Sequence, residues 1–246
     1  MSHIIKPSEA EQEANEGLAV PRDRRAFLKW SGGAAVAILA MRGAVLASEG
    51  NGLFSLPIAQ DGTAVDLGKG DFGILNYAYA LEQLEAAFYT QVTQNFYSGA
   101  TDEERQVLTQ IRDHEIAHRE FFKAALGKKA IPALQANFSA VDFRSRDSVL
   151  NTSRTFEDLG VSAYNGAGQL FKSATFLLLA GKIVSVEARH AAAIRDLLQP
   201  RTAYFSGDDV TDPSTGLDPA RRPSEVLQAA APFIRTPVTA NNLPTS

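Results

Sequence analysis

The chain has 246 residues, of which 45% are hydrophobic and 21% charged, and it is long enough for one domain with a sizeable core beside an N-terminal targeting segment. The formal net charge is −4 and no basic run is present, which argues against a nucleic-acid partner. The sequence contains no cysteine, so disulfides, thiolate metal ligands and a cysteine nucleophile are excluded.

Residues 1–47 have the parts of an export signal. The charged run Arg-Arg-Ala-Phe-Leu-Lys at residues 24–29 precedes an Ala- and Gly-rich apolar stretch from Trp30 to Met41, and small or permissive residues at 45–47 precede a cleavage site near Ser48. The stretch is too short to span a bilayer comfortably, so anchoring by an uncleaved signal is the weaker interpretation. The paired arginines followed by Phe-Leu-Lys resemble a twin-arginine signal. We therefore expect export by the twin-arginine translocase to the periplasm or the exterior.

Four helices are predicted after an irregular, Gly-rich linker at residues 48–71. They span about 72–95, 101–126, 147–166 and 173–199. The second begins with a capping box made by Thr101 and Glu104, and the fourth is stopped by Pro200. No segment shows sustained alternation of apolar and polar residues, so strands are not expected.

The lengths of the connections predict how these helices are arranged. The first and second helices, and the third and fourth, are separated by only a few residues, which makes each pair an antiparallel hairpin. About twenty residues, 127–146, separate the two hairpins. The predicted fold is therefore all-α: a four-helix bundle over residues 72–199 made of two antiparallel hairpins and one long crossover. The extension at 200–246 is predicted to hold one short helix at about 224–231 and a loose tail.

The inward faces of the second and fourth helices are apolar except at their middles, where a Glu and a His lie one turn apart. These pairs are Glu115 with His118, and Glu187 with His190. The first and third helices place Glu82 and Glu157 inward, each followed seven residues later by a tyrosine, Tyr89 and Tyr164.

Four buried carboxylates need a physical reason, because an unpaired ionised Glu inside a bundle costs several kcal/mol. Two divalent cations would cancel four carboxylate charges, and two neutral imidazoles would complete the coordination. Oxygen and imidazole ligands without sulfur favour iron or manganese over copper(I) or a structural zinc. The sequence therefore predicts a site for two iron or two manganese ions.

These segments resemble the ferritin-like superfamily. The resemblance is carried by Glu-Gln-Leu-Glu-Ala-Ala-Phe-Tyr at 82–89, Glu115-x-x-His118, residues 157–164 and Glu187-x-x-His190, and it covers about 72–199. Within the superfamily the chain is most similar to an exported group that includes plant desiccation-related proteins. The resemblance implies a metal pair that reacts with dioxygen or hydrogen peroxide, in protection against oxidative or desiccation stress.

The resemblance also implies roles for individual residues. Glu115 and Glu187 would bridge the two metals, Tyr89 and Tyr164 would hydrogen-bond to ligand carboxylates, and Glu85, one turn from Glu82, is a lesser candidate. The implied metal ligands are Glu82, Glu115, His118, Glu157, Glu187 and His190.

Two alternatives remain open from the sequence. His114-Glu115-x-x-His118 matches the H-E-x-x-H motif of zinc metalloproteases, although no His or Glu follows Glu120 within twenty-odd residues to supply a third ligand. The second alternative is a metal-binding or iron-sequestering protein without turnover. Whether the protein is an enzyme, which metal it holds and whether it forms a homo-oligomer are left open. His114 lies off the inward face and is expected to be exposed or to support a ligand.

Overall fold

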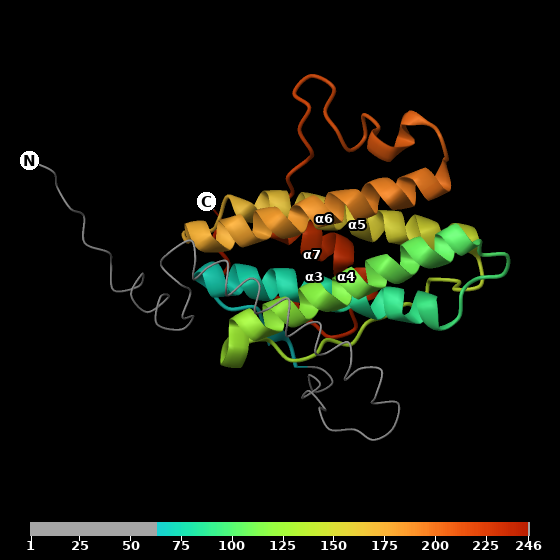
Figure 1. The fold of residues 1–246 in the computed structure, drawn as a ribbon. Coiled ribbons are helices and arrows are strands. Elements are labelled where there is room, and N and C mark those ends of the chain that lie inside the picture. The colour runs from blue at the N-terminus through green and yellow to red at the C-terminus, as the bar shows by residue number, and fades with distance from the viewer. Residues whose placement is uncertain (1–62, 246) are drawn as a thin grey trace, which may run out of the picture. The chain divides into compact units, whose positions relative to one another are not determined.

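Four long helices lie side by side in the structure, a computed structural model that describes residues 63–245 (Figure 1). They are α3 (Gly70–Gln94), α4 (Asp102–Leu126), α5 (Arg146–Gly168) and α6 (Ala174–Leu198). The predicted helical bundle with a short C-terminal helix is confirmed. The predicted export signal and the first part of the predicted linker, residues 1–62, lie outside the described residues.

The helix ends follow local chemistry that can be read in the sequence. Thr101 caps α4: its side chain accepts a hydrogen bond from the backbone N–H of Glu104, and the Glu104 carboxylate accepts one from the backbone N–H of Thr101. Ser145 and Ser173 cap α5 and α6 in the simpler way, each accepting one backbone N–H. Gly127 ends α4 with a φ of 53°, a backbone conformation that glycine adopts readily.

Packing is most extensive between α3 and α4 and between α5 and α6, as expected for two helical hairpins. The crossover between the hairpins begins with the short 3₁₀ helix η1 (Gly127–Lys129) and continues without regular structure to Ser145. Hydrogen bonds from Asn76 of α3 fix the start of this crossover against the bundle. The Asn76 side-chain amide donates to the carbonyl of Lys129, and its side-chain oxygen accepts from the N–H of Ile131.

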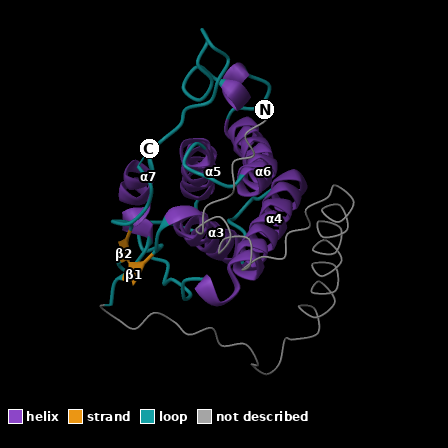
Figure 2. Ribbon diagram, turned by 90° about the vertical axis from the view of Figure 1, so that its left-hand side faces the viewer, coloured by secondary structure: helices purple, strands orange, loops and turns teal. Residues whose placement is uncertain are grey.

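The C-terminal extension holds the short helix that we expected, but part of the loose tail predicted beside it has regular structure. It contains η2 (Ala203–Ser206), α7 (Pro223–Ala230), η3 (Ala231–Phe233) and β2 (Val238–Thr239). The strand β2 pairs in parallel with β1 (Val65–Asp66), which lies just before α3 (Figure 2). Strands of two residues are too short to produce the alternation that predicts a strand from sequence, which explains the difference.

The extension is also attached to the bundle by polar contacts. The backbone N–H of Arg221 donates a hydrogen bond to the Ser162 carbonyl oxygen of α5 at 2.9 Å. The two segments lie so close that a Cβ atom at Gly166 would be 1.8 Å from the Arg221 carbonyl oxygen. The buried guanidinium of Arg195 in α6 pairs with Asp158 of α5 and with Asp209 of the extension. None of the described helices is both long and apolar enough to cross a membrane.

Candidate metal centre

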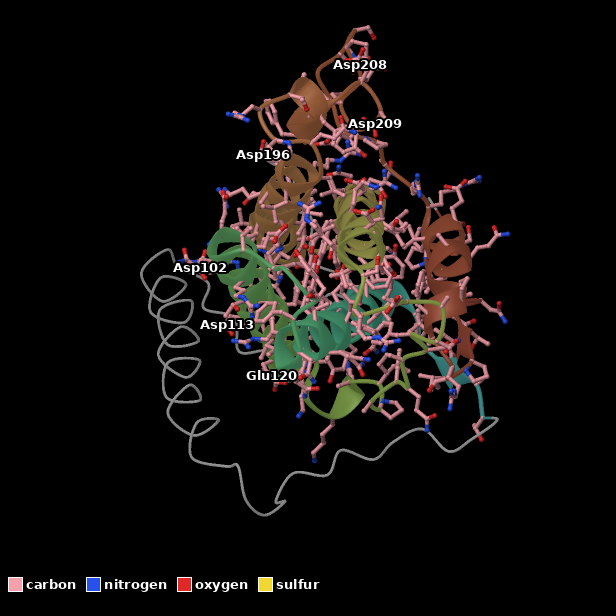
Figure 3. The ribbon with its side chains drawn as sticks, turned by 90° about the vertical axis from the view of Figure 1, so that its right-hand side faces the viewer. Asp102, Asp113, Glu120, Asp196, Asp208 and Asp209 are labelled. Carbon is pink, nitrogen blue, oxygen red and sulfur yellow. The ribbon has the colours of Figure 1, made fainter. Side chains whose placement is uncertain are left out.

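The inward faces predicted for the four helices are the buried faces in the structure. Along α4 and α6 the apolar positions on either side of the Glu–His pairs are buried, and the side chains of Glu82, Glu115, Glu157 and Glu187 are 0% exposed. Other acidic residues lie on the outer surface, among them Asp102 and Asp196, which Figure 3 labels. Carboxylates are almost never fully buried without a partner, so four of them in one core require an explanation.

The structure brings all six predicted ligands together in the middle of the bundle. Their candidate ligand atoms form two groups, and within each group these atoms lie within 4.8 Å of one another. Glu115 and Glu187 belong to both groups. The first group adds Glu82 and His118, and the second adds Glu157 and His190. Two neighbouring cation positions that share Glu115 and Glu187 are compatible with this arrangement.

Both imidazoles turn their Nδ1 atom toward the carboxylates. The Nδ1 atom of His118 lies 2.9 Å from Glu187, 3.4 Å from Glu115 and 3.5 Å from Glu82. In the same way, Nδ1 of His190 lies 2.8 Å from Glu115, 3.4 Å from Glu157 and 3.7 Å from Glu187.

Many of the inward-facing atoms lack a hydrogen-bond partner. Within residues 63–245, no hydrogen bond of suitable geometry is found for the following buried atoms, although the two imidazoles lie within ion-pair distance of the carboxylates: Oε2 of Glu82 and of Glu157, both carboxylate oxygens of Glu115 and of Glu187, and Nδ1 of His118 and of His190. A buried polar atom without a partner costs about 1–3 kcal/mol and is uncommon in native proteins. Because these atoms converge on one place and are all oxygen or imidazole nitrogen, the residues fit a metal site with oxygen and nitrogen ligands.

The pKa values of the cluster also reflect the crowding of buried carboxylates. Burial and the neighbouring charge of Glu187 raise the pKa of Glu115 well above its usual range. Burial alone would lower the pKa of His190, but the carboxylates, first that of Glu157, outweigh it and raise the pKa to about 12. Burial opposes ionisation of Glu187, yet its contacts with His118 and His190 lower its pKa to about 2. The buried carboxylates therefore stabilise positive charge at this place, which divalent cations would also supply.

Two tyrosines connect the halves of the cluster. The hydroxyl of Tyr89 in α3 donates to Oε1 of Glu157 in α5 at 2.5 Å, and the hydroxyl of Tyr164 in α5 donates to Oε1 of Glu82 in α3. Burial, and next the adjacent carboxylate, raise the pKa of each phenol, so both hydroxyls remain protonated donors. Each hydrogen bond occupies one oxygen of a carboxylate and leaves the other, Oε2, facing the centre.

Glu85 is a fifth buried carboxylate beside the cluster, although it belongs to neither group of candidate ligands. It occupies room left by Gly160: a Cβ atom there would lie 3.2 Å from Oε1 of Glu85 and 3.7 Å from Oε2 of Glu187. Burial and then the charge of Glu187 raise the pKa of Glu85 well above its usual range. The structure thus places this lesser candidate next to the centre and not in it.

His114 is exposed and also contacts a predicted ligand, so both roles that the sequence left open for it apply. Its Nδ1 atom lies 2.8 Å from Nε2 of His190, on the side of that ring opposite the carboxylates, and it belongs to neither group of candidate ligands. The two histidines of the H-E-x-x-H motif therefore do not converge on one position. This geometry argues against the zinc-protease alternative.

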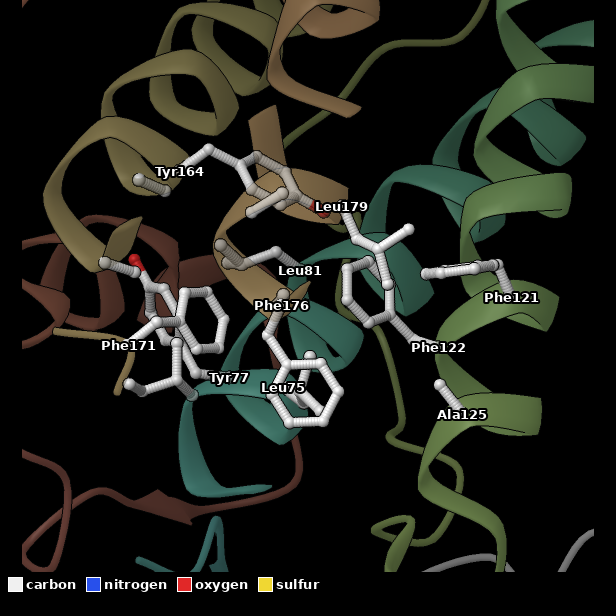
Figure 4. A pocket seen from close by; sticks show the side chains of 15 residues that line it. Leu75, Tyr77, Leu81, Phe121, Phe122, Ala125, Tyr164, Phe171, Phe176 and Leu179 are labelled. Atoms are coloured by element: carbon white, nitrogen blue, oxygen red, sulfur yellow. The ribbon is translucent and has the colours of Figure 1, made fainter. Parts of the chain in front are cut away.

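An apolar cavity adjoins the cluster toward one end of the bundle (Figure 4). Its volume, measured as the space open to the centre of a water-sized sphere, is about 20 Å³. Aliphatic and aromatic side chains of all four helices line it. Tyr164 lines it and also donates to Glu82, so the cavity ends at a residue that contacts the candidate centre. Sequence reasoning did not identify this cavity, since it depends on how four helices leave space between side chains.

A family model described as a ferritin-like domain matches residues 70–200, which is 131 of the 246 residues. A search of curated proteins found no match. The matched segment contains all four long helices and every residue of the cluster. Because the match covers more than half of the chain, the protein belongs to the ferritin-like domain family.

Proposed function

We propose that the protein holds two iron or two manganese ions between its four long helices and uses them to reduce dioxygen or hydrogen peroxide. The observation that carries this proposal is the convergence of eight buried oxygen and nitrogen atoms that have no hydrogen-bond partner among the described residues. Four carboxylates balance the charge of two divalent cations, whereas in their absence the same carboxylates repel one another.

In this proposal the protein's residues have separate tasks. Glu115 and Glu187 would be shared by the two positions, Glu82 and His118 would complete one, and Glu157 and His190 would complete the other. Tyr89 and Tyr164 hold the Glu157 and Glu82 carboxylates in orientation. The bound divalent metals would supply two electrons, enough with two protons to reduce one dioxygen to peroxide or one peroxide to water. Repeated turnover would need a second peroxide or an external electron donor to reduce the metals again.

The apolar cavity beside Tyr164 supports a small oxidant. An apolar cavity of this kind admits small non-polar molecules in preference to charged ones, and dioxygen has the appropriate size and polarity. Peroxide is the second candidate substrate. We further propose that the twin-arginine motif at residues 24–29 directs the folded protein out of the cytoplasm. Outside the cytoplasm it protects against oxidative or desiccation stress.

The experiment is to load metal-free protein with Fe(II) or Mn(II), count the bound metal by elemental analysis, and then measure consumption of dioxygen and of peroxide. We expect two metals per chain and turnover of one oxidant. Two bound metals with no consumption of either oxidant would support a metal-sequestering protein instead. A single zinc ion that is lost in His114→Ala would support a protease and refute the proposal.

A further inference from the structure

The two halves of the candidate centre repeat one another along the sequence. Each half has an inward Glu, a Tyr seven residues later, and a Glu-x-x-His pair on the next helix. The repeat is also present in the structure, because the tyrosine of each half donates a hydrogen bond to the inward Glu of the other half. Any residue that breaks the repeat therefore makes the two metal positions different.

His114 breaks the repeat. It lies four residues before His118 on α4, and the corresponding position on α6, four residues before His190, is Val186. The ring of His114 reaches across to α6 and lies nearly parallel to that of His190, with the two ring planes at 12° and Nδ1 of His114 2.8 Å from Nε2 of His190. Among residues 63–245 no protein group hydrogen-bonds to Nε2 of His118. Only one of the two candidate histidine ligands thus has a protein partner on its outer nitrogen.

The direction of this hydrogen bond follows from where a metal would bind. Nδ1 of His190 faces the carboxylates, so a neutral ring that binds through Nδ1 must carry its proton on Nε2. That N–H then donates to Nδ1 of His114, whose own ring proton is on Nε2. Metal-binding histidines nearly always donate their second N–H to a carboxylate, a carbonyl or water, and this donation fixes both the tautomer and the ring orientation.

We propose that His114 is a positioning residue that holds His190 in the metal-binding tautomer, so that one of the two metal positions depends on it and the other does not. The position concerned is the one formed by Glu157 and His190 with the shared Glu115 and Glu187. This inference rests on the proposed two-metal function. Because His114 is exposed, it also connects that position to solvent through one side chain.

The test is a titration of metal-free protein with Mn(II), in which electron paramagnetic resonance of the free ion gives the number of sites and the affinity of each. Wild type is compared with His114→Ala, His114→Asn and Val186→Ala. The Asn side-chain oxygen can accept a hydrogen bond close to where Nδ1 of His114 does, and Val186→Ala is the matched truncation in the other half. Circular dichroism of each variant checks that the helices are formed.

We expect two sites in wild type. In His114→Ala one site should weaken about 10- to 100-fold, as is typical when the outer partner of a metal ligand is lost, while both still fill at saturating Mn(II). His114→Asn should recover most of that loss, and Val186→Ala should not weaken one site selectively. Two wild-type affinities in His114→Ala, or equal weakening of both sites, would overturn this inference and leave the two-metal proposal standing. No Mn(II) binding by wild type would overturn both.

Discussion

The shared carboxylates give the sharpest test of how the cluster works. Glu187→Gln keeps the size of the side chain and removes one negative charge, and Glu187 belongs to both groups of candidate ligands. Glu82→Gln makes the same chemical change at a residue that belongs to one group only. The comparison therefore separates a bridging role from a terminal one.

The magnitude follows from the charge balance. Four carboxylates match two divalent cations, so losing one leaves a unit of positive charge uncompensated among side chains that are 0% exposed. Removing one partner of a buried ion pair typically costs about 3–5 kcal/mol. That cost corresponds to roughly a 100- to 4,000-fold loss of metal affinity. We expect Glu187→Gln to weaken both positions by this amount, and Glu82→Gln to weaken one.

Isothermal titration calorimetry with Mn(II), followed by elemental analysis of the dialysed protein, measures both the affinities and the number of retained metals. The exposed Glu103 provides the control, since Glu103→Gln removes a charge outside the bundle on the same helix as Glu115. If Glu187→Gln retained two metals with wild-type affinity, the assignment of Glu187 as a shared ligand would be refuted.

Three further predictions concern the surroundings of the cluster. The metal-free protein should lose stability as pH rises above about 6.5, because the pKa of His190, raised to about 12, lets the folded state keep a proton that the unfolded state releases. His190 alone contributes a slope of about 1.4 kcal/mol per pH unit, and the raised pKa of His118 adds to it in the same direction. Urea unfolding at pH 6 and pH 9 measures the loss, and greater stability at pH 9 would contradict the prediction. Tyr164→Phe should lower the metal affinity of the position that includes Glu82 by about 10- to 100-fold and leave the other position unchanged. Tyr89→Phe should lower the affinity of the position that includes Glu157 instead, in the same Mn(II) titration. Ala125→Leu, which adds volume to the lining of the apolar cavity, should slow the reaction with dioxygen in stopped-flow measurements without changing metal content, and an unchanged rate would exclude the cavity as an access route.

Local and periodic signals in the sequence predicted the bundle and its inward faces. The capping box at Thr101 marks the start of α4 directly, and steps of three and four residues place Glu115 and Glu187 inside because the flanking positions are apolar. The buried carboxylates could be identified for the same reason: a charged residue on an apolar face is conspicuous. These features depend on residues within one helix.

Features that depend on contacts between distant segments could not be predicted. The β1–β2 pair joins Val65 to Val238, and neither segment is long enough to show a periodic pattern. The contact of His114 with His190 depends on how α4 lies against α6, and the attachment of the extension at Gly166 depends on the path of the chain after Pro200. Sequence reasoning left the role of His114 open because spacing within α4 cannot specify its neighbour on another helix.

A crystal structure of the protein loaded with Mn(II) or Fe(II), with anomalous scattering recorded for that metal, tests the central claim most directly. The account predicts two anomalous peaks per chain inside the bundle, both beside Glu115 and Glu187, one next to His118 and the other next to His190. The absence of peaks at these carboxylates, or one peak bound by His114 and His118 together, would contradict it.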